Sequence, residues 1–96
     1  MIKVLIVDDH ALVRLGIRRL LEDTDDIEVV AEAEDGESAV TQAQHYQPDI
    51  ILLDLKMPSL DGLEVIRRLK HLGVASKIIA VSAVSAEPMP GKVLQL

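Results

Sequence analysis

The sequence predicts an α/β domain built on a doubly wound parallel sheet. Short runs of branched apolar residues alternate with amphipathic segments, which is the pattern of parallel strands joined by helical crossovers. The clearest strand is Ile50 to Asp54, an unbroken apolar run that ends in a carboxylate and that we expect to be buried on both faces. The chain of 96 residues is 49% apolar, which suits one domain with an aliphatic core.

The first part of the chain predicts a strand, a helix and a second strand. Ile2 to Val7 is apolar apart from one lysine and predicts a buried strand. From His10 to Glu22 apolar residues recur at helical spacing, and Arg14, Arg18 and Arg19 form a basic stripe that we expect to be solvated or to contact a partner. Ile27 to Ala33 alternates apolar residues with glutamates, which favours a less buried strand at an edge.

The second part repeats the alternation. Glu37 to Tyr46 predicts a helix, which a proline then ends. After the central strand and a loop rich in turn-forming residues, apolar spacing predicts a third helix that begins near Leu63 and ends at Gly73. Lys77 to Val81 predicts a fourth strand, with Ser82 at its carboxyl end.

The segment Ala83 to Leu96 departs from this pattern. Prolines and a glycine interrupt it before Lys92, and the residues that follow are compatible with a helical turn, so no fifth strand is predicted. The fourth strand would then be an exposed apolar edge, which invites pairing with another chain. We therefore expect a homodimer, or a segment-exchanged dimer, formed through the fourth strand and this tail.

Polar residues collect where the predicted strands end. Asp8 and Asp9 follow the first strand, Asp54 ends the third, and Ser82 ends the fourth. Carboxyl ends of parallel strands meet at one edge of the sheet, where ligands bind. Close carboxylate pairs repel by roughly 4 kcal/mol at an effective dielectric of about 20, so a divalent cation is expected there, and Mg²⁺ suits oxygen ligands best. With such a cation, Asp54 can attack a phosphoryl group to form an aspartyl phosphate, while Ser82 offers a hydroxyl to the phosphoryl oxygens.

Each of these residues also has a purely structural interpretation. Asp8 and Asp9 can cap the helix that follows them, and Asp54 can simply end its strand. A serine such as Ser82 at a strand end usually makes local hydrogen bonds. Convergence of acids from separate strands favours the shared cation site. His10 is expected beside these acids in the first turn of its helix, without an assigned role as a ligand.

Three separated motifs resemble those of the receiver domain of bacterial two-component response regulators. They are Val-Asp-Asp-His at positions 7–10, Asp-Leu-Lys-Met-Pro-Ser-Leu-Asp-Gly at 54–62, and Ser82 closing an apolar strand. The Asp-Asp-His start, a Leu-Val-Arg-x-Gly-Ile run and a Glu-Pro-Met-Pro stretch resemble the NarL/FixJ branch, including its GacA- and UvrY-like members. The resemblance implies a flavodoxin-like fold with strand order 2-1-3-4.

The resemblance also implies roles for individual residues. Asp54 would be the phosphoacceptor, Asp9 a direct Mg²⁺ ligand, Asp8 a ligand through water, the Lys56 carbonyl a third protein ligand and Ser82 the switch hydroxyl. Phosphoryl would come from a sensor histidine kinase, and the surface after the fourth strand would change. The domain would be no enzyme beyond its own phosphorylation and dephosphorylation.

The family carries a fifth strand with a lysine that pairs with the phosphate, followed by a fifth helix, and the sequence stops before both. Residues 1–96 are therefore expected to be an incomplete receiver domain, with a helix-turn-helix DNA-binding domain downstream in the intact protein. A phosphorylation-incompetent fragment that self-associates is one alternative function. A Mg²⁺-dependent phosphatase with an aspartyl nucleophile is another, although such enzymes usually place two aspartates two residues apart, and Asp8 and Asp9 are adjacent.

Composition excludes several other classes. Nucleotide or flavin binding is disfavoured, because there is no glycine-rich phosphate loop and no pair of aromatic residues. The net charge of −6 disfavours direct contact with nucleic acid. The absence of cysteine excludes thiolate metal sites. Without a leader or a long apolar run, the chain is expected to be cytoplasmic and not to contact a membrane.

Overall fold

The computed structural model of the chain describes residues 1–55, 62–82 and 92–95, with Ser82 and residues 92–95 described by their backbone alone. The elements in chain order are β1 (Ile2–Val7), α1 (Ala11–Glu22), β2 (Ile27–Ala33), α2 (Gly36–Tyr46), β3 (Ile50–Asp54), α3 (Gly62–His71), β4 (Lys77–Ser82) and β5 (Lys92–Gln95).

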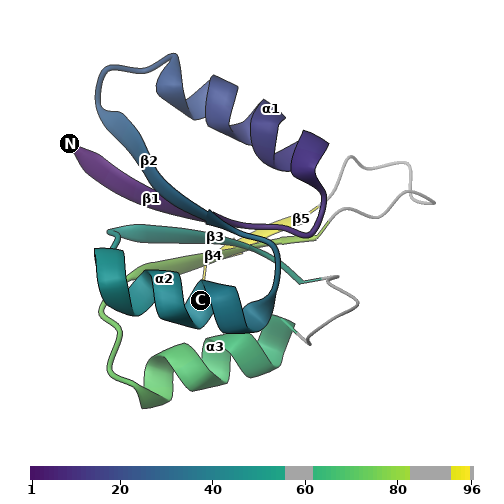
Figure 1. The fold of residues 1–96 in the computed structure, drawn as a ribbon, viewed down its shortest axis with the longest axis vertical. Helices are drawn as coiled ribbons and strands as arrows, with labels where there is room; N and C mark the ends of the chain where they lie inside the picture. Colours follow the sequence, from purple (N-terminus) through teal and green to yellow (C-terminus); the bar gives the residue numbers. More distant parts are fainter. Residues whose placement is uncertain (56–61, 83–91, 96) are drawn as a thin grey trace.

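The sheet has the strand order β2-β1-β3-β4-β5, and its first four strands are parallel. The predicted order 2-1-3-4 is therefore confirmed. Helix α1 covers one face of the sheet, and α2 and α3 cover the other (Figure 1). The expectation that β2 is a less buried edge strand is also confirmed, because its residues alternate between buried and partly exposed.

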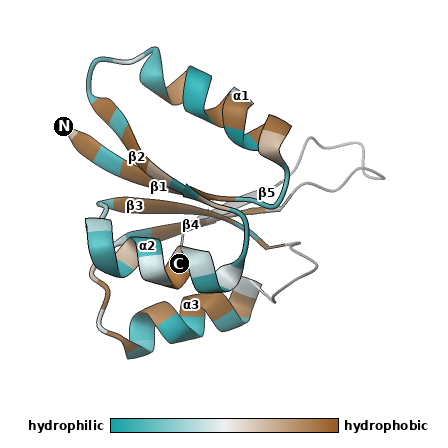
Figure 2. Cartoon of the chain, viewed as in Figure 1, coloured by the Kyte–Doolittle hydropathy of each residue, from teal (hydrophilic) through white to brown (hydrophobic). Residues whose placement is uncertain are grey.

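Successive residues of the strands point to opposite faces of the sheet and pack into two separate hydrophobic cores. Leu5, Ile51 and Leu53 belong to the larger core, on the side of α2 and α3. Val4 and Ile6 point to the opposite face, where Ile17 and other partly buried residues of α1 pack against them. Fully burying such a side chain contributes roughly 1.5–3 kcal/mol, so the apolar strands stabilise the sheet from both sides. Figure 2 colours most of β1 and β3 as hydrophobic, which agrees with their burial on both faces.

The two faces are not covered equally. No residue of α1 is fully buried, and Leu12 and Leu20 are 79% and 75% exposed. By contrast, α2 and α3 each bury four residues against the sheet or each other. The face under α1 is consequently the more open one.

The end of the tail forms a strand, which corrects two expectations. Residues Lys92 to Gln95 pair with β4 in antiparallel register, from Ile79↔Gln95 to Ser82↔Lys92, so the tail is not helical there and the sheet does not stop at β4. Unpaired backbone groups along an apolar edge favour the addition of a strand. Residues 83–91 are too few for the crossover of a dozen or more residues that a parallel strand needs.

This pairing also bears on the predicted dimer. The dimer was expected because β4 would be an open edge, but β5 of the same chain occupies that edge (Figure 1). Dimerisation remains a prediction, now without the feature that motivated it.

The predicted helices are found with small shifts at their ends. Helix α2 starts at Gly36, where Asp35 accepts a hydrogen bond from the Ser38 amide as an N-cap. Helix α3 ends at His71, two residues earlier than expected, because Gly73 adopts a φ of 74° and the chain turns away. The amides of Gly73 and Val74 then donate to carbonyls of the last helical turn. Among the described helices, none has the length and apolar character needed to cross a bilayer.

Candidate functional site

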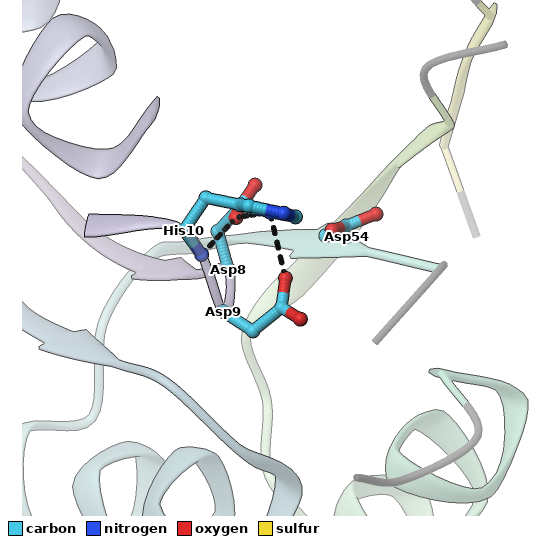
Figure 3. A group of neighbouring side chains, drawn as sticks. All are labelled: Asp8, Asp9, His10 and Asp54. Carbon is cyan, nitrogen blue, oxygen red and sulfur yellow. Dashed lines mark hydrogen bonds and ion pairs between the residues drawn. The ribbon is translucent and has the colours of Figure 1, made fainter. Parts of the chain in front are cut away.

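The three predicted acids meet at the carboxyl ends of β1 and β3. Val7 pairs with Leu53 across the two strands, so the next residues, Asp8 and Asp54, lie side by side at this edge of the sheet. One carboxylate oxygen from each of Asp8, Asp9 and Asp54, together with a ring nitrogen of His10, lies within 4.8 Å of the others (Figure 3). The structure thus brings together residues from two distant parts of the sequence.

Asp8 both ends β1 and starts α1. Its amide donates to the Ala33 carbonyl of β2 at 3.0 Å, and its Oδ1 accepts a 2.8 Å hydrogen bond from the His10 amide. The residue is only 8% exposed. The N-cap of α1 is His10, and no side chain makes a cap hydrogen bond there, so the interpretation of Asp8 and Asp9 as helix caps is wrong. Asp8 instead stabilises the turn that precedes α1 while it contributes to the cluster.

Asp9 provides the observation that tests whether a cation fits. Its Oδ1 is buried and has no hydrogen-bond partner within the described part of the chain. The Nδ1 atom of His10 lies 2.8 Å away from it as an ion-pair contact, and the same nitrogen is hydrogen-bonded to the Oδ1 of Asp8 at 3.2 Å. A buried acceptor left unsatisfied costs about 1–3 kcal/mol, and more when it is charged. The buried oxygen and the neighbouring carboxylates are a donor set that fits a hard divalent cation such as Mg²⁺.

Asp54 is half-buried and reachable. It is the last residue of β3 and pairs with Val81 of β4. It lines a cavity of about 430 Å³ on the α1 side of the sheet. The other residues lining that cavity are Ile6, Val7, Asp8, His10, Val13, Ile17, Leu52 and Val81. The acid is therefore not sealed in an apolar pocket. A larger cavity of about 810 Å³ lies at the opposite edge of the sheet, where the strands begin, away from the acids.

Two further predicted residues are placed less completely. Ser82 follows the Asp54↔Val81 pair on the neighbouring strand, so its backbone lies at the same edge as the acids, and its side chain is not described. Lys56 lies outside the described residues, and its proposed carbonyl ligand stays a prediction. His45 and His71 are exposed on α2 and α3, as expected.

Arg14 supports the site in a way that the sequence did not indicate. Its Nη1 donates a 2.6 Å hydrogen bond to the main-chain carbonyl of Asp8, and its Nε donates to Glu32 of β2 at 3.0 Å. Arg18 donates to the other oxygen of Glu32 at 2.7 Å. Two of the three residues of the expected basic stripe are thus paired with β2. Their spacing of four residues was the available signal, but nothing in it pointed to Glu32.

Gly62 allows α3 to start directly against the end of β3. A Cβ atom at this position would lie 2.8 Å from the Leu55 Cα and 3.4 Å from the Asp54 carbonyl oxygen. Real Cβ atoms essentially never approach backbone at the shorter of these distances. A side chain at position 62 would therefore displace the backbone that carries Asp54.

Comparison with known proteins agrees with this geometry. Residues 4–96 match the family described as the response regulator receiver domain. The chain is 44% identical over 95 residues to the response regulator GacA of Pseudomonas syringae and 46% identical over 95 residues to the response regulator UvrY of Escherichia coli. The signal receiver domain of the response regulator NarL from Mycobacterium tuberculosis superposes with a TM-score of 0.81 at 34% identity, covering 91% of this chain and 69% of that one.

The match extends over most of this chain but not over most of the relatives. It covers 99% of this chain and 44% of GacA and of UvrY, so the chain spans less than half the length of these curated relatives. The matching family model, the two relatives and the flavodoxin-like order of strands β2-β1-β3-β4 all indicate the same assignment. With its acids gathered where β1 and β3 end, this chain belongs to the family of response regulator receiver domains.

Proposed function

We propose that this chain accepts a phosphoryl group on Asp54 from a sensor histidine kinase, with Mg²⁺ as the required cation. The observation that carries the proposal is the approach of Asp8, Asp9 and Asp54 to within 4.8 Å at the strand ends. Receiver domains are generally signalling domains and not enzymes. This chain would accordingly catalyse at most its own phosphorylation and dephosphorylation.

Asp8, Asp9 and Asp54 would hold the cation, and the Lys56 carbonyl would add a further ligand. When bound, Mg²⁺ supplies positive charge that offsets the repulsion between the acids and an incoming phosphoryl group. An oxygen of Asp54 forms the bond to phosphorus while the phosphorus–nitrogen bond of the donor phosphohistidine breaks, and the imidazole leaves. The half-buried position of Asp54 beside a cavity supports this role, because the attacking oxygen has room for a phosphoryl group.

Phosphorylation of Asp54 would change the structure at the end of β4. Ser82 sits at the end of β4, one residue beyond the partner of Asp54, so its hydroxyl is suited to follow the new phosphoryl oxygens. A change there would alter the surface around the end of β4. In the intact protein we propose that this surface controls a DNA-binding domain downstream, in the cytoplasm, and that the receiver domain itself contacts neither DNA nor membrane.

Incubation with Mg²⁺ and acetyl phosphate, followed by intact mass spectrometry, tests the proposal. We expect an added mass of one phosphoryl group, lost on treatment with hydroxylamine and absent in Asp54→Asn. Asp25→Asn, at an exposed acid outside the cluster, should label like the wild type. Labelling that survives Asp54→Asn would refute the assignment.

The same experiment separates the alternatives. A phosphatase would turn over a phosphate ester steadily instead of stopping at one phosphoryl group per chain. A phosphorylation-incompetent module would bind Mg²⁺ without any labelling, and the occupation of the β4 edge by β5 removes the motive for self-association through that strand.

A further inference from the structure

We propose that Glu32, on the edge strand β2, is a positioning residue for phosphoryl transfer, although it lies outside the acid cluster. It acts through Arg14, which connects Glu32 to the main chain between Asp8 and Asp9. This inference rests on the proposed function of Asp54 and adds a remote residue that controls how well the acids receive their cation.

Both backbone polar groups of Asp8 are held by adjacent residues of β2. The Asp8 amide donates to the Ala33 carbonyl at 3.0 Å. The Asp8 carbonyl accepts a 2.6 Å hydrogen bond from Nη1 of Arg14, and Nε of the same guanidinium donates to Glu32 at 3.0 Å. The end of β1 is therefore fastened to β2 twice, once directly and once through Arg14.

The strand register explains why Glu32 meets α1. Glu32 pairs with Ile6, and paired residues of neighbouring strands point to the same face of the sheet. Ile6 packs in the core under α1, so Glu32 also points toward that helix. Arg14 and Arg18 donate to different oxygens of Glu32, at 3.0 and 2.7 Å. The carboxylate cannot turn without breaking one of these ion pairs.

The bond from Arg14 constrains Asp9 as well as Asp8. The Asp8 carbonyl belongs to the peptide unit that joins these two acids, and because this unit is planar, holding its oxygen restricts the direction in which the chain enters Asp9. Asp9 needs such a constraint, since its buried Oδ1 has no hydrogen-bond partner among the described residues. A buried acceptor in that state favours any rearrangement that gives it a partner. The link from Glu32 through Arg14 opposes such a rearrangement.

Glu32 would have a purely structural role if it only attached α1 to the sheet. Arg18 provides an attachment of that kind, because it pairs with Glu32 and, at 3.5 Å, with Glu22 of its own helix. Arg14 differs from Arg18 in two ways: its side chain is 15% exposed against 33%, and its second bond goes to Asp8. That second bond is what gives Glu32 an effect at the site.

Mg²⁺ affinity, measured by isothermal titration calorimetry, separates positioning from simple charge effects. Glu32→Gln should weaken Mg²⁺ binding by on the order of tenfold, the lower end of the range for residues that support metal ligands. Glu28→Gln removes the same charge from an exposed position on the same strand and should bind Mg²⁺ like the wild type. Arg14→Gln decides the question, because loss of a positive charge beside the acids alone would tighten Mg²⁺ binding, whereas loss of positioning weakens it. Tighter binding would overturn the inference.

The double variant Arg14→Gln/Glu32→Gln tests whether the two residues act together. If Glu32 acts through Arg14, adding Glu32→Gln to Arg14→Gln should change the dissociation constant little. Losses that multiply would overturn the inference. Glu32→Asp, which keeps the charge but withdraws the carboxylate by one methylene, should also weaken Mg²⁺ binding, and it replaces Glu32→Gln if that variant does not fold.

The metal-free protein gives a readout that depends on neither Mg²⁺ nor phosphorylation. In ¹H–¹⁵N NMR spectra the Asp9 amide signal should move in Glu32→Gln and stay in place in Glu28→Gln. An unmoved Asp9 signal with wild-type Mg²⁺ affinity in folded Glu32→Gln would overturn the inference and leave the proposed function intact. Absence of labelling in the wild type would instead refute the proposed function, while the Mg²⁺ and amide measurements would still decide the role of Glu32.

Discussion

Arg14 holds the main-chain carbonyl of Asp8 with a 2.6 Å hydrogen bond from its Nη1 atom. The same guanidinium reaches Glu32 on β2, so one side chain of α1 connects the end of β1 to the neighbouring strand. Its side chain is only 15% exposed. Asp8 is thus fixed by its backbone, in addition to the turn that its own carboxylate makes with His10.

Replacing Arg14 by Gln should weaken Mg²⁺ binding as well as the fold. Loss of the bond to Asp8 and of the pair with Glu32 is expected to lower the free energy of unfolding by about 1.5–3 kcal/mol, the usual range for hydrogen bonds to charged groups. Arg18→Gln is the matched control, because Arg18 binds Glu32 but does not contact Asp8. Urea denaturation and Mg²⁺ titration measure the two effects. A loss of Mg²⁺ affinity equal in both variants would contradict a role for Arg14 at the site.

Gly62→Ala should destabilise the protein through the backbone of β3. The added methyl would meet the Leu55 Cα at 2.8 Å, and relieving such overlap typically costs about 1–3 kcal/mol. Gly16→Ala is the contrasting variant, since it lies within α1 with open space around it and should stabilise the helix by roughly 0.5–1 kcal/mol. Thermal unfolding followed by circular dichroism should shift in opposite directions for the two. A neutral Gly62→Ala would show that α3 can move away from β3 at little cost.

Asp9→Asn should separate stability from metal binding. Without Mg²⁺, removal of one converging charge reduces repulsion within the cluster, so the melting temperature is expected to stay level or rise. In wild type, Mg²⁺ at 100 times its dissociation constant should add about 2.7 kcal/mol of stability, and this increase should disappear in Asp9→Asn. Melting curves with Mg²⁺ and with a chelator provide the measurement. If Mg²⁺ stabilised both proteins equally, Asp9 would not be a ligand.

The sequence predicted most of the fold because most of its elements carry a strong local pattern. The unbroken apolar run Ile50 to Asp54 is β3 to the residue, and helical spacing placed α1 within one residue of its observed start. The strand Lys92 to Gln95 was missed because four residues carry little periodic signal. Its conformation depends on the available edge of β4, a feature that arises only in the assembled sheet.

The candidate site also has features that the sequence predicted and features that it did not. Asp8, Asp9 and Asp54 were found because parallel topology alone brings the ends of neighbouring strands together. The bonds from Arg14 depend on how α1 crosses β2, and the distance between His10 and Asp9 depends on side-chain rotation. Neither quantity is encoded in residue spacing.

The unequal cover of the two sheet faces implies unequal local stability. Helix α1 buries no residue completely, while α2 and α3 on the other face are anchored by fully buried side chains. Opening of α1 alone therefore exposes less apolar surface and requires less free energy than global unfolding. Amide protons of α1 should exchange with deuterium before those of α2, and because α1 begins at the Asp8–His10 turn, an ion bound at that turn should slow the exchange of its first residues.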